Sequence, residues 1–135
     1  MRITPGAAVN GLPFSVAHEA ILLSIGDPDE VRLTESGEVE YVYSINERHA
    51  VIYRCHEQRL VECTFPDHGP IVMDGLPIVS AKPWIAAQSG ALHVARFWIS
   101  PDHCIAYDDR DSANGSFTVY RHGHWDQLIN QARRL

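Results

Sequence analysis

Histidine is the residue type that most strongly suggests chemistry in this sequence, because eight of its 135 residues are histidines. His122 and His124 are separated by one residue, so on a β-strand both imidazoles would lie on the same side. His103 lies on a neighbouring predicted strand and would supply a third nitrogen. Three protein ligands and one open position are typical of a catalytic zinc ion. A small His-ligated metal-dependent enzyme is therefore one hypothesis for the function.

The local sequence argues against that site. Gly123 separates the two histidines, and His124 directly precedes a predicted helix. The sequence therefore does not indicate the strand that would place both imidazoles on one side. The other histidines considered, His18, His49, His56 and His68, show no metal-ligand spacing among themselves. We therefore predict no bound metal and no cofactor, and interpret these histidines as surface residues near turns.

Cysteine chemistry is not favoured either. Cys55, Cys63 and Cys104 are odd in number and form no CxxC pair, which argues against a zinc knuckle or a disulfide framework. A histidine adjoins two of them in sequence, but neighbouring residues of a strand point to opposite faces and cannot relay a proton. We expect three reduced, buried cysteines and no catalytic residue.

The acidic run Asp108, Asp109 and Asp111 faintly resembles an oxygen-rich calcium loop, but the Glu that should stand twelfth from its first Asp is missing. A solvated hairpin loop is the simpler interpretation. The phosphate-binding and hydrolase motifs GxGxxG, HExxH and GxSxG do not occur.

Composition limits the class of protein and its partners. With 45% hydrophobic and 21% charged residues, the chain has the composition of a folded globular domain. A net charge of −6 argues against nucleic acid as a partner and suits a basic protein. No long apolar run follows the N-terminal residues 1–6 or occurs elsewhere, so we expect a cytoplasmic protein with no membrane partner.

A repeated motif organises the chain. The tetrapeptide at 11–14, Gly-Leu-Pro-Phe, recurs at 75–78 as Gly-Leu-Pro-Ile, an offset of 64 residues that also aligns Gly26 with Gly90 and Tyr43 with Tyr107. We predict a single domain over 1–135, with repeat one at about 10–65 and repeat two at about 74–129. The alternative is two helix starts that use similar entry residues.

The pattern of apolar residues predicts a helix and then a β-meander in each repeat. The first helix begins at Ser15 and ends at Gly26, and the second covers about 79–89. The strands predicted after the first helix are 31–34, 38–45, 49–55 and 60–65, and those predicted after the second are 91–99, 103–108 and 116–121. A C-terminal helix is predicted over 125–134. The predicted fold class is α+β: an antiparallel sheet built from two helix-plus-meander repeats, with the helices on one face.

A two-residue turn at Asn46-Glu47 would place Tyr43 opposite Ala50 and so decide which residues share a sheet face. The side toward the helices would then hold Tyr41, Tyr43, Ile45, Ala50, Ile52, Val61, Cys63 and Phe65. The opposite side would hold Glu40, Val42, Ser44, His49, Val51, Tyr53, Glu62 and Thr64. Such a mixture of acidic and aromatic residues is typical of a protein-binding surface, although a wet sheet face with a few apolar residues is the alternative.

A short helix, a Gly-Asp-Pro step at 26–28 and a meander containing Tyr-x-Tyr, repeated in tandem over about 10–125, resemble the β-lactamase inhibitory proteins and small bacterial immunity proteins. The resemblance implies that a sheet face, or the loops at its rim, covers the active site of an enzyme. The secreted inhibitors carry disulfides in each half, and this chain does not share that pattern, which favours a cytoplasmic immunity role.

The sequence thus predicts a non-enzymatic inhibitor or immunity protein that binds a cognate bacterial toxin or enzyme, as in a toxin–antitoxin pair, and blocks its active site. The residues expected to contact the partner are Glu40, Tyr53, Glu62, Trp98, Asp108, Asp109 and Asp111. The alternatives are the metal-dependent enzyme with His103, His122 and His124, and a homodimeric ligand-binding module whose mixed sheet face is the subunit interface.

Overall fold

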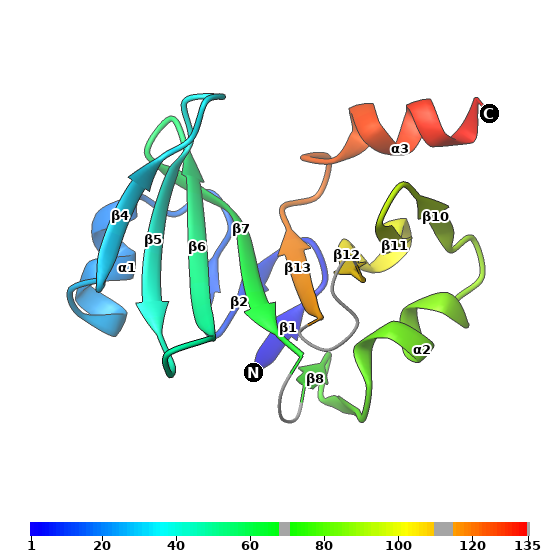
Figure 1. The fold of residues 1–135 in the computed structure, drawn as a ribbon, viewed down its shortest axis with the longest axis horizontal. Coiled ribbons are helices and arrows are strands. Elements are labelled where there is room, and N and C mark those ends of the chain that lie inside the picture. The colour runs from blue at the N-terminus through cyan, green and yellow to red at the C-terminus, as the bar shows by residue number, and fades with distance from the viewer. Residues whose placement is uncertain (68–70, 110–114, 135) are drawn as a thin grey trace.

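The fold was analysed in a computed structural model, which describes residues 1–67, 71–109 and 115–134. Two sheets and three short α-helices make up this described part of the protein (Figure 1). The helices are α1 (His18–Ile25), α2 (Ala81–Ala86) and α3 (Asp126–Arg133), with a 3₁₀ turn η1 at Pro101–His103. The α+β class is confirmed, because most of the structure is antiparallel sheet.

The larger sheet has eight strands in the order β10-β11-β12-β13-β7-β6-β5-β4. Its strands are β4 (Glu30–Leu33), β5 (Val39–Ser44), β6 (Ala50–His56), β7 (Arg59–Pro66), β10 (Leu92–Val94), β11 (Phe97–Ser100), β12 (Ile105–Asp108) and β13 (Ser116–Tyr120). Two four-strand meanders meet where β7 pairs antiparallel with β13. Phe65 lies opposite Phe117 at this seam, and the two rings stack at 5.4 Å between centroids.

The smaller sheet has five strands in the order β3-β2-β1-β8-β9, and the sequence patterns did not predict it. Its strands are β1 (Arg2–Thr4), β2 (Ala8–Val9), β3 (Leu12–Pro13), β8 (Ile71–Met73) and β9 (Leu76–Ile78). These segments are only two or three residues long, too short to show the alternation that identifies a strand. β1 pairs in parallel with β8 and so joins the N-terminus to the middle of the chain.

The motif found at 11–14 and 75–78 marks two tight hairpin turns in this smaller sheet. Asn10 and Gly11 link β2 to β3, while Asp74 and Gly75 link β8 to β9. Their φ angles are 50° and 79° in the first turn and 51° and 79° in the second. Two successive positive φ angles define the I′ hairpin turn, which favours Asn or Asp followed by Gly. The order hairpin, helix, four antiparallel strands therefore occurs twice, while gene duplication itself stays a prediction.

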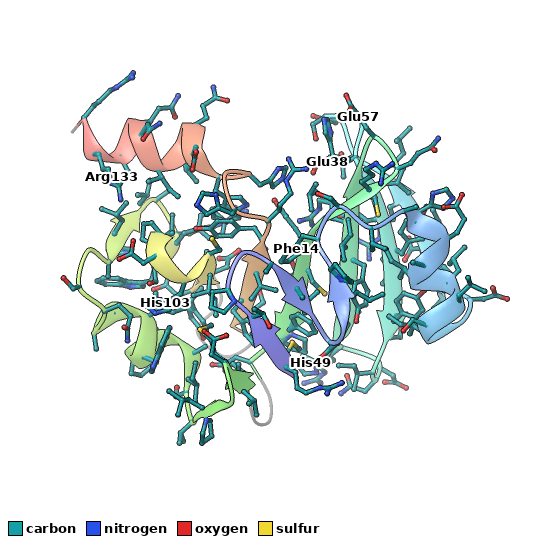
Figure 2. All side chains as sticks on the ribbon, turned by 180° about the vertical axis from the view of Figure 1, so that it is seen from behind. Phe14, Glu38, His49, Glu57, His103 and Arg133 are labelled. Carbon is teal, nitrogen blue, oxygen red and sulfur yellow. The ribbon has the colours of Figure 1, made fainter. Side chains whose placement is uncertain are left out.

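The core lies between the two sheets. One face of the larger sheet, here called the inner face, contributes apolar residues that pack with the small sheet and with Ile21 of α1 and Ile85 of α2. Figure 2 views the molecule from this side, with the small sheet in front of the larger one and between α1 and α2. The inner-face residues in this cluster include Tyr53, Cys55, Cys63, Phe65, Ile105, Tyr107, Phe117 and Val119.

The third helix packs on the opposite face, here called the outer face. Ile129 of α3 clusters with Ile99, Ala106 and Tyr120, which alternate along their strands with inner-face residues. The expectation that all helices lie on one face is therefore not confirmed. Figure 1 shows α3 beside the β10–β12 half of the sheet and away from β4–β6. One end of the outer face is covered by a helix, and the β5–β6 end lies apart from it.

Two predicted elements differ from the structure for local reasons. The first helix begins at His18 and not at Ser15, because the amide of Ser15 donates to the carbonyl of Leu60 (2.7 Å) and ties this segment to β7. The predicted strand 91–99 is instead a hairpin of β10 and β11 that turns at Ala95, whose φ is +51°. Alanine gives no turn signal, so the sequence pattern missed this reversal.

The turn between β5 and β6 also differs, and this difference has consequences for both faces. Tyr43 pairs with Val51, not with Ala50 as predicted. The side-chain oxygen of Asn46 accepts from the amides of Arg48 (2.8 Å) and His49 (2.9 Å), which holds a longer loop than the two residues expected. A shift of one residue turns every side chain of a strand to the other face, so the predicted faces of β6 are wrong, while those of β5 and of residues 62–65 in β7 hold.

Candidate functional site

A row of alternating charge crosses the outer face. Glu40 on β5 lies directly opposite Arg54 on β6, and Arg54 lies opposite Glu62 on β7. The guanidinium of Arg54 donates to both carboxylates, with Nε 3.0 Å from Oε2 of Glu40. Opposite charges at directly paired positions attract across a sheet. The three strands therefore place this Glu40–Arg54–Glu62 row by register alone.

Glu62 is the most enclosed carboxylate of the row, with its side chain only 9% exposed. Its Oε1 accepts from the indole nitrogen of Trp125 at 2.8 Å and lies 3.1 Å from Nε2 of His124. Burial opposes its ionisation, but the hydrogen bond from His124, the charge of Arg54 and the hydrogen bond from Trp125 outweigh this, so the pKa of Glu62 is lowered. Glu62 is therefore a buried carboxylate held in its charged form.

Glu38 completes a second group of side chains around His124. Its Oε2 lies 3.7 Å from Nε2 of His124, and its Oε1 accepts from the hydroxyl of Ser36 at 3.1 Å. Oε2 is buried and has no hydrogen-bond partner among the described residues. One ligand atom each from Glu38, Glu62 and His124 lies within 4.8 Å of the others. We call these three residues the acid–histidine cluster; Figure 2 labels Glu38 near the loop that leads into α3.

Two clefts flank Glu62 and Trp125. The first, of about 330 Å³, is lined by Arg54 and Glu62 of the charge row and by hydroxyl side chains, and its apolar residues include Phe97 and Trp125. Within it, the hydroxyls of Thr64 and Thr118 lie 2.8 Å apart across the seam of the two meanders. The second, of about 300 Å³, lies against α3 and is lined by Glu62, His124, Trp125, Gln127, Leu128 and Gln131.

Three of the predicted partner-contacting residues lie together on the outer face. Glu40 and Glu62 bond to Arg54, and Asp108 lies 3.1 Å from Nε of Arg96. Glu62 and Asp108 both line the first cleft. Each of these carboxylates therefore has a positive partner within the protein, so the face is polar but not a field of unpaired negative charge.

The prediction of Tyr53 as an outer-face residue is wrong, and Trp98, the other aromatic residue expected to contact a partner, does not lie on the outer face either. Tyr53 is 3% exposed and belongs to the core, a consequence of the shifted β5–β6 register. Burial raises the pKa of its phenol to about 12. Trp98 packs on the inner-face cluster and stacks on His93 at 4.3 Å between ring centroids, while its neighbour Phe97 lies on the outer face beside Trp125.

The remaining acidic predictions fall at a loop. Asp109 follows β12 and pairs with Lys82 of α2 at 3.0 Å, so it does not join the outer cluster of carboxylates. Asp111 lies outside the described residues.

The three histidines proposed as metal ligands are not brought together. His103 packs edge-on against Trp84 at 4.8 Å between centroids, and its Nδ1 lies 2.8 Å from the hydroxyl of Ser100. His122 is exposed, and its amide donates to the carbonyl of Gly6. Among the described residues, one group of side chains could hold a metal ion, and it consists of Glu38, Glu62 and His124. Of the three proposed histidines, it includes His124 alone.

The cysteines are free and buried, as expected. Burial raises the pKa of Cys55 to about 11 and also raises the pKa of Cys104. A nucleophilic cysteine needs the opposite shift, because the thiolate is the reactive form. The structure therefore gives no support to cysteine catalysis.

Sequence reasoning missed Arg54, Glu38 and the role of Trp125. The charge alternation Glu40–Arg54–Glu62 was detectable in principle, but only with the correct β5–β6 register, because the incorrect one turned Arg54 to the wrong face. Glu38 and His124 are 86 residues apart in sequence, and nothing in their local sequences relates them. Tertiary structure alone joins them.

Glu62 is thus contacted from one side by Arg54 of β6 and from the other by His124 and Trp125, which lead into α3. Comparison of the chain with protein families, with curated proteins and with solved structures finds no match.

Proposed function

We propose that this protein is a non-enzymatic inhibitor or immunity protein, which docks its outer sheet face onto a cognate bacterial toxin or enzyme and blocks the partner's active site. The observation that carries the proposal is the cleft of about 330 Å³ at the centre of this face. The inner face of the same strands is occupied by core packing, and α3 covers only the far end. The outer face is therefore the large sheet surface that remains for a partner.

The residues of the cleft suit protein recognition. Trp125 and Phe97 offer apolar ring surface, and Arg54 and Arg96 offer charged hydrogen-bond donors. Trp and Arg are the residue types most enriched among energetically dominant interface positions. Hydroxyls of Thr64 and Thr118 supply neutral polar contacts at the floor. An apolar wall with a polar floor is the composition expected of an interface centre.

The charge of the protein favours a basic partner. The whole chain carries a net charge of −6, which attracts a positively charged surface during diffusional encounter. The outer-face carboxylates already pair with arginines, so their contribution is to orient a partner more than to attract it. We place the protein in the cytoplasm as part of this proposal; the described residues contain no helix long and apolar enough to cross a bilayer.

The proposal includes the origin of the fold by duplication of one unit of hairpin, helix and four strands. The two I′ turns have nearly identical φ angles. In the eight-stranded sheet each unit's strands run in chain order from the outer edge to the centre, β4 to β7 from one edge and β10 to β13 from the other. Each unit alone would expose its β7 or β13 seam strand. The duplicated sheet is wide enough to present a face larger than one unit could.

Affinity capture from the native host, followed by an activity assay, tests the function. The wild-type chain should hold one protein in stoichiometric amount and abolish that protein's enzymatic activity or toxicity. Ile52→Glu, at a half-buried residue that lines the outer cleft, should weaken the complex by at least about a hundredfold, because a charge at an interface centre costs several kcal/mol. Isothermal titration calorimetry measures both affinities.

Val79→Glu is the matched control. Val79 is 98% exposed in the connection from β9 to α2 and does not line the outer cleft. Binding should be unchanged in this variant. A partner that is bound without loss of its activity, or that is released by Val79→Glu and not by Ile52→Glu, would contradict the proposed function.

A homodimer is the second candidate function. The structure favours the edge strand β4, and not the outer sheet face, as the interface of such a dimer. All four residues of β4 are exposed, including Val31 (57%) and Leu33 (76%), and Leu23 of the preceding helix is 89% exposed. An exposed apolar edge strand is a template for pairing with another chain. Light scattering after gel filtration would show a dimer that Val31→Lys dissociates.

A further inference from the structure

The acid–histidine cluster is built from three separate parts of the chain. Glu38 lies just before β5, Glu62 lies within β7, and His124 lies in the connection from β13 to α3. Nε2 of His124 is 3.1 Å from Oε1 of Glu62 and 3.7 Å from Oε2 of Glu38. The side chains of His124, Glu62 and Glu38 are 19%, 9% and 18% exposed, so the cluster is largely shielded from water.

The spacing of these atoms matches a metal coordination sphere. Zinc binds imidazole nitrogen and carboxylate oxygen at about 2.0–2.2 Å, so a tetrahedral ion places its ligand atoms about 3.4 Å apart. The two measured separations lie on either side of this value, and all three atoms fall within 4.8 Å of one another. Small side-chain rotations are enough to close them on one ion.

We propose that Glu38, Glu62 and His124 bind a divalent transition-metal ion of the zinc class, with a fourth coordination position open toward the cleft lined by Gln127, Leu128 and Gln131. Imidazole together with carboxylates selects this class over magnesium or calcium, which prefer sites made of oxygen alone. This ligand set shares only His124 with the three histidines that the sequence suggested.

The charge of the surroundings is the first independent support. Glu38, Glu40 and Glu62 are three carboxylates, and among the described residues Arg54 is the guanidinium that pairs with Glu40 and Glu62, which leaves two negative charges when His124 is neutral. Burying an uncompensated charge is costly. A divalent cation balances both charges, and a protonated His124 balances only one.

The unpaired oxygen of Glu38 is the second independent support for the metal site. Oε2 is buried, points toward His124 and lacks a hydrogen-bond partner among the described residues. Buried polar atoms in proteins are otherwise almost always paired. A metal ion supplies the partner that this atom lacks.

The groups around Glu62 are those that fix a metal-binding carboxylate. The indole of Trp125 donates to its Oε1 and Arg54 to its Oε2, so the carboxylate has a defined orientation. Partners of this kind orient metal ligands and raise metal affinity. The ion would also join the β4–β5 turn, β7 and the start of α3, and so stabilise the folded form.

Metal titration of the purified full-length chain tests the site. After treatment with EDTA and dialysis, calorimetry with zinc chloride should show one high-affinity equivalent per chain, and cobalt(II) should give the strong visible absorption of a four-coordinate site. His124→Ala and Glu38→Gln should each weaken zinc binding by at least about tenfold. Metal should raise the melting temperature of the wild type and not that of these variants.

Two control variants make the result specific. His122→Ala removes an exposed histidine two positions away, and Glu57→Gln removes a carboxylate that is 86% exposed. Both should bind zinc as the wild type does. Circular dichroism without metal shows whether each variant is folded; Glu62 is left intact because Arg54 depends on it.

The proposal is overturned if folded wild-type protein binds no stoichiometric zinc, if Glu38→Gln or His124→Ala binds as tightly as wild type, or if His122→Ala abolishes binding. Its outcome is independent of the partner-binding function, because the partner's affinity can be measured in EDTA. A partner that binds equally well with and without metal leaves the metal site standing.

Discussion

The two faces of the eight-stranded sheet use the same strands for opposite purposes. On β7, Cys63 and Phe65 point to the inner face and are buried among apolar residues, while Glu62 and Thr64, which alternate with them, point to the outer face. The inner face joins the core with the small sheet, α1 and α2. The outer face holds paired charges, hydroxyls and two clefts.

The comparison shows where stability and specificity come from. Apolar residues on the inner face gain free energy from burial without needing an exact partner. Each charge on the outer face loses hydration and needs a partner with the right geometry to recover that loss. The outer face therefore adds little net stability, but it fixes Arg54, Glu62 and His124 in one arrangement.

The largest expected effect is at the seam of the inner face. Phe65→Ala removes a ring that is 2% exposed and stacked on Phe117, and should lower the free energy of unfolding by about 3–5 kcal/mol. Urea denaturation followed by circular dichroism measures the loss. Ile52→Ala, on the outer face of the adjacent strand, should cost less than half as much; equal losses would mean that the two faces do not differ as described.

The next effect breaks the charge row on the outer face. Arg54→Met leaves Glu40 and Glu62 without their cation in a mostly buried position, and should cost about 3 kcal/mol in urea denaturation in the presence of EDTA. The triple variant Arg54→Met, Glu40→Gln, Glu62→Gln should recover most of this loss, because no charge is then unpaired. A triple variant as unstable as Arg54→Met would show that the row itself is strongly stabilising.

A smaller effect isolates one hydrogen bond. Trp125→Phe removes the indole donor to Glu62 while keeping an aromatic ring to stack on Tyr120, whose centroid is 4.9 Å away. The expected cost is about 1.5 kcal/mol, the usual value for a hydrogen bond to a charged group. Trp125→Ala, which also removes the ring, should cost more; if both variants cost the same, the stacking contributes nothing.

The smallest effect compares one exposed ion pair from each side of the sheet. Arg96→Ala removes the pair with Asp108, and Lys82→Ala removes the pair with Asp109; both basic side chains are 44% exposed. Each should cost less than about 1 kcal/mol, since solvent and salt screen such pairs. Thermal melts at low and high salt measure them. A larger loss for Arg96→Ala alone would point to its packing over Phe97 at 5.0 Å.

Much of the fold was predictable because its signals are local. The predicted strands 38–45 and 60–65 and the C-terminal helix at 125–134 match β5, β7 and α3 within two residues at each end. The Asn46 loop shows where local signals fail, since a side chain that caps its own turn added residues to it and reversed the faces of β6. Because of that single error, the predicted site included Tyr53, which lies on the inner face, and omitted Arg54, which lies on the outer face.

The sequence by itself determined the α+β class, the order of the helices and of most strands of the larger sheet, the buried free cysteines and the presence of Glu40 and Glu62 on one face. Alternation along a strand and turn chemistry at Gly and Asn act over a few residues, so these features are encoded locally. Tertiary structure alone decided the small parallel-joined sheet, the placement of α3 on the outer face and the meeting of Glu38 and Glu62 with His124. Those features depend on packing between segments up to 86 residues apart, and no short window of sequence contains both partners.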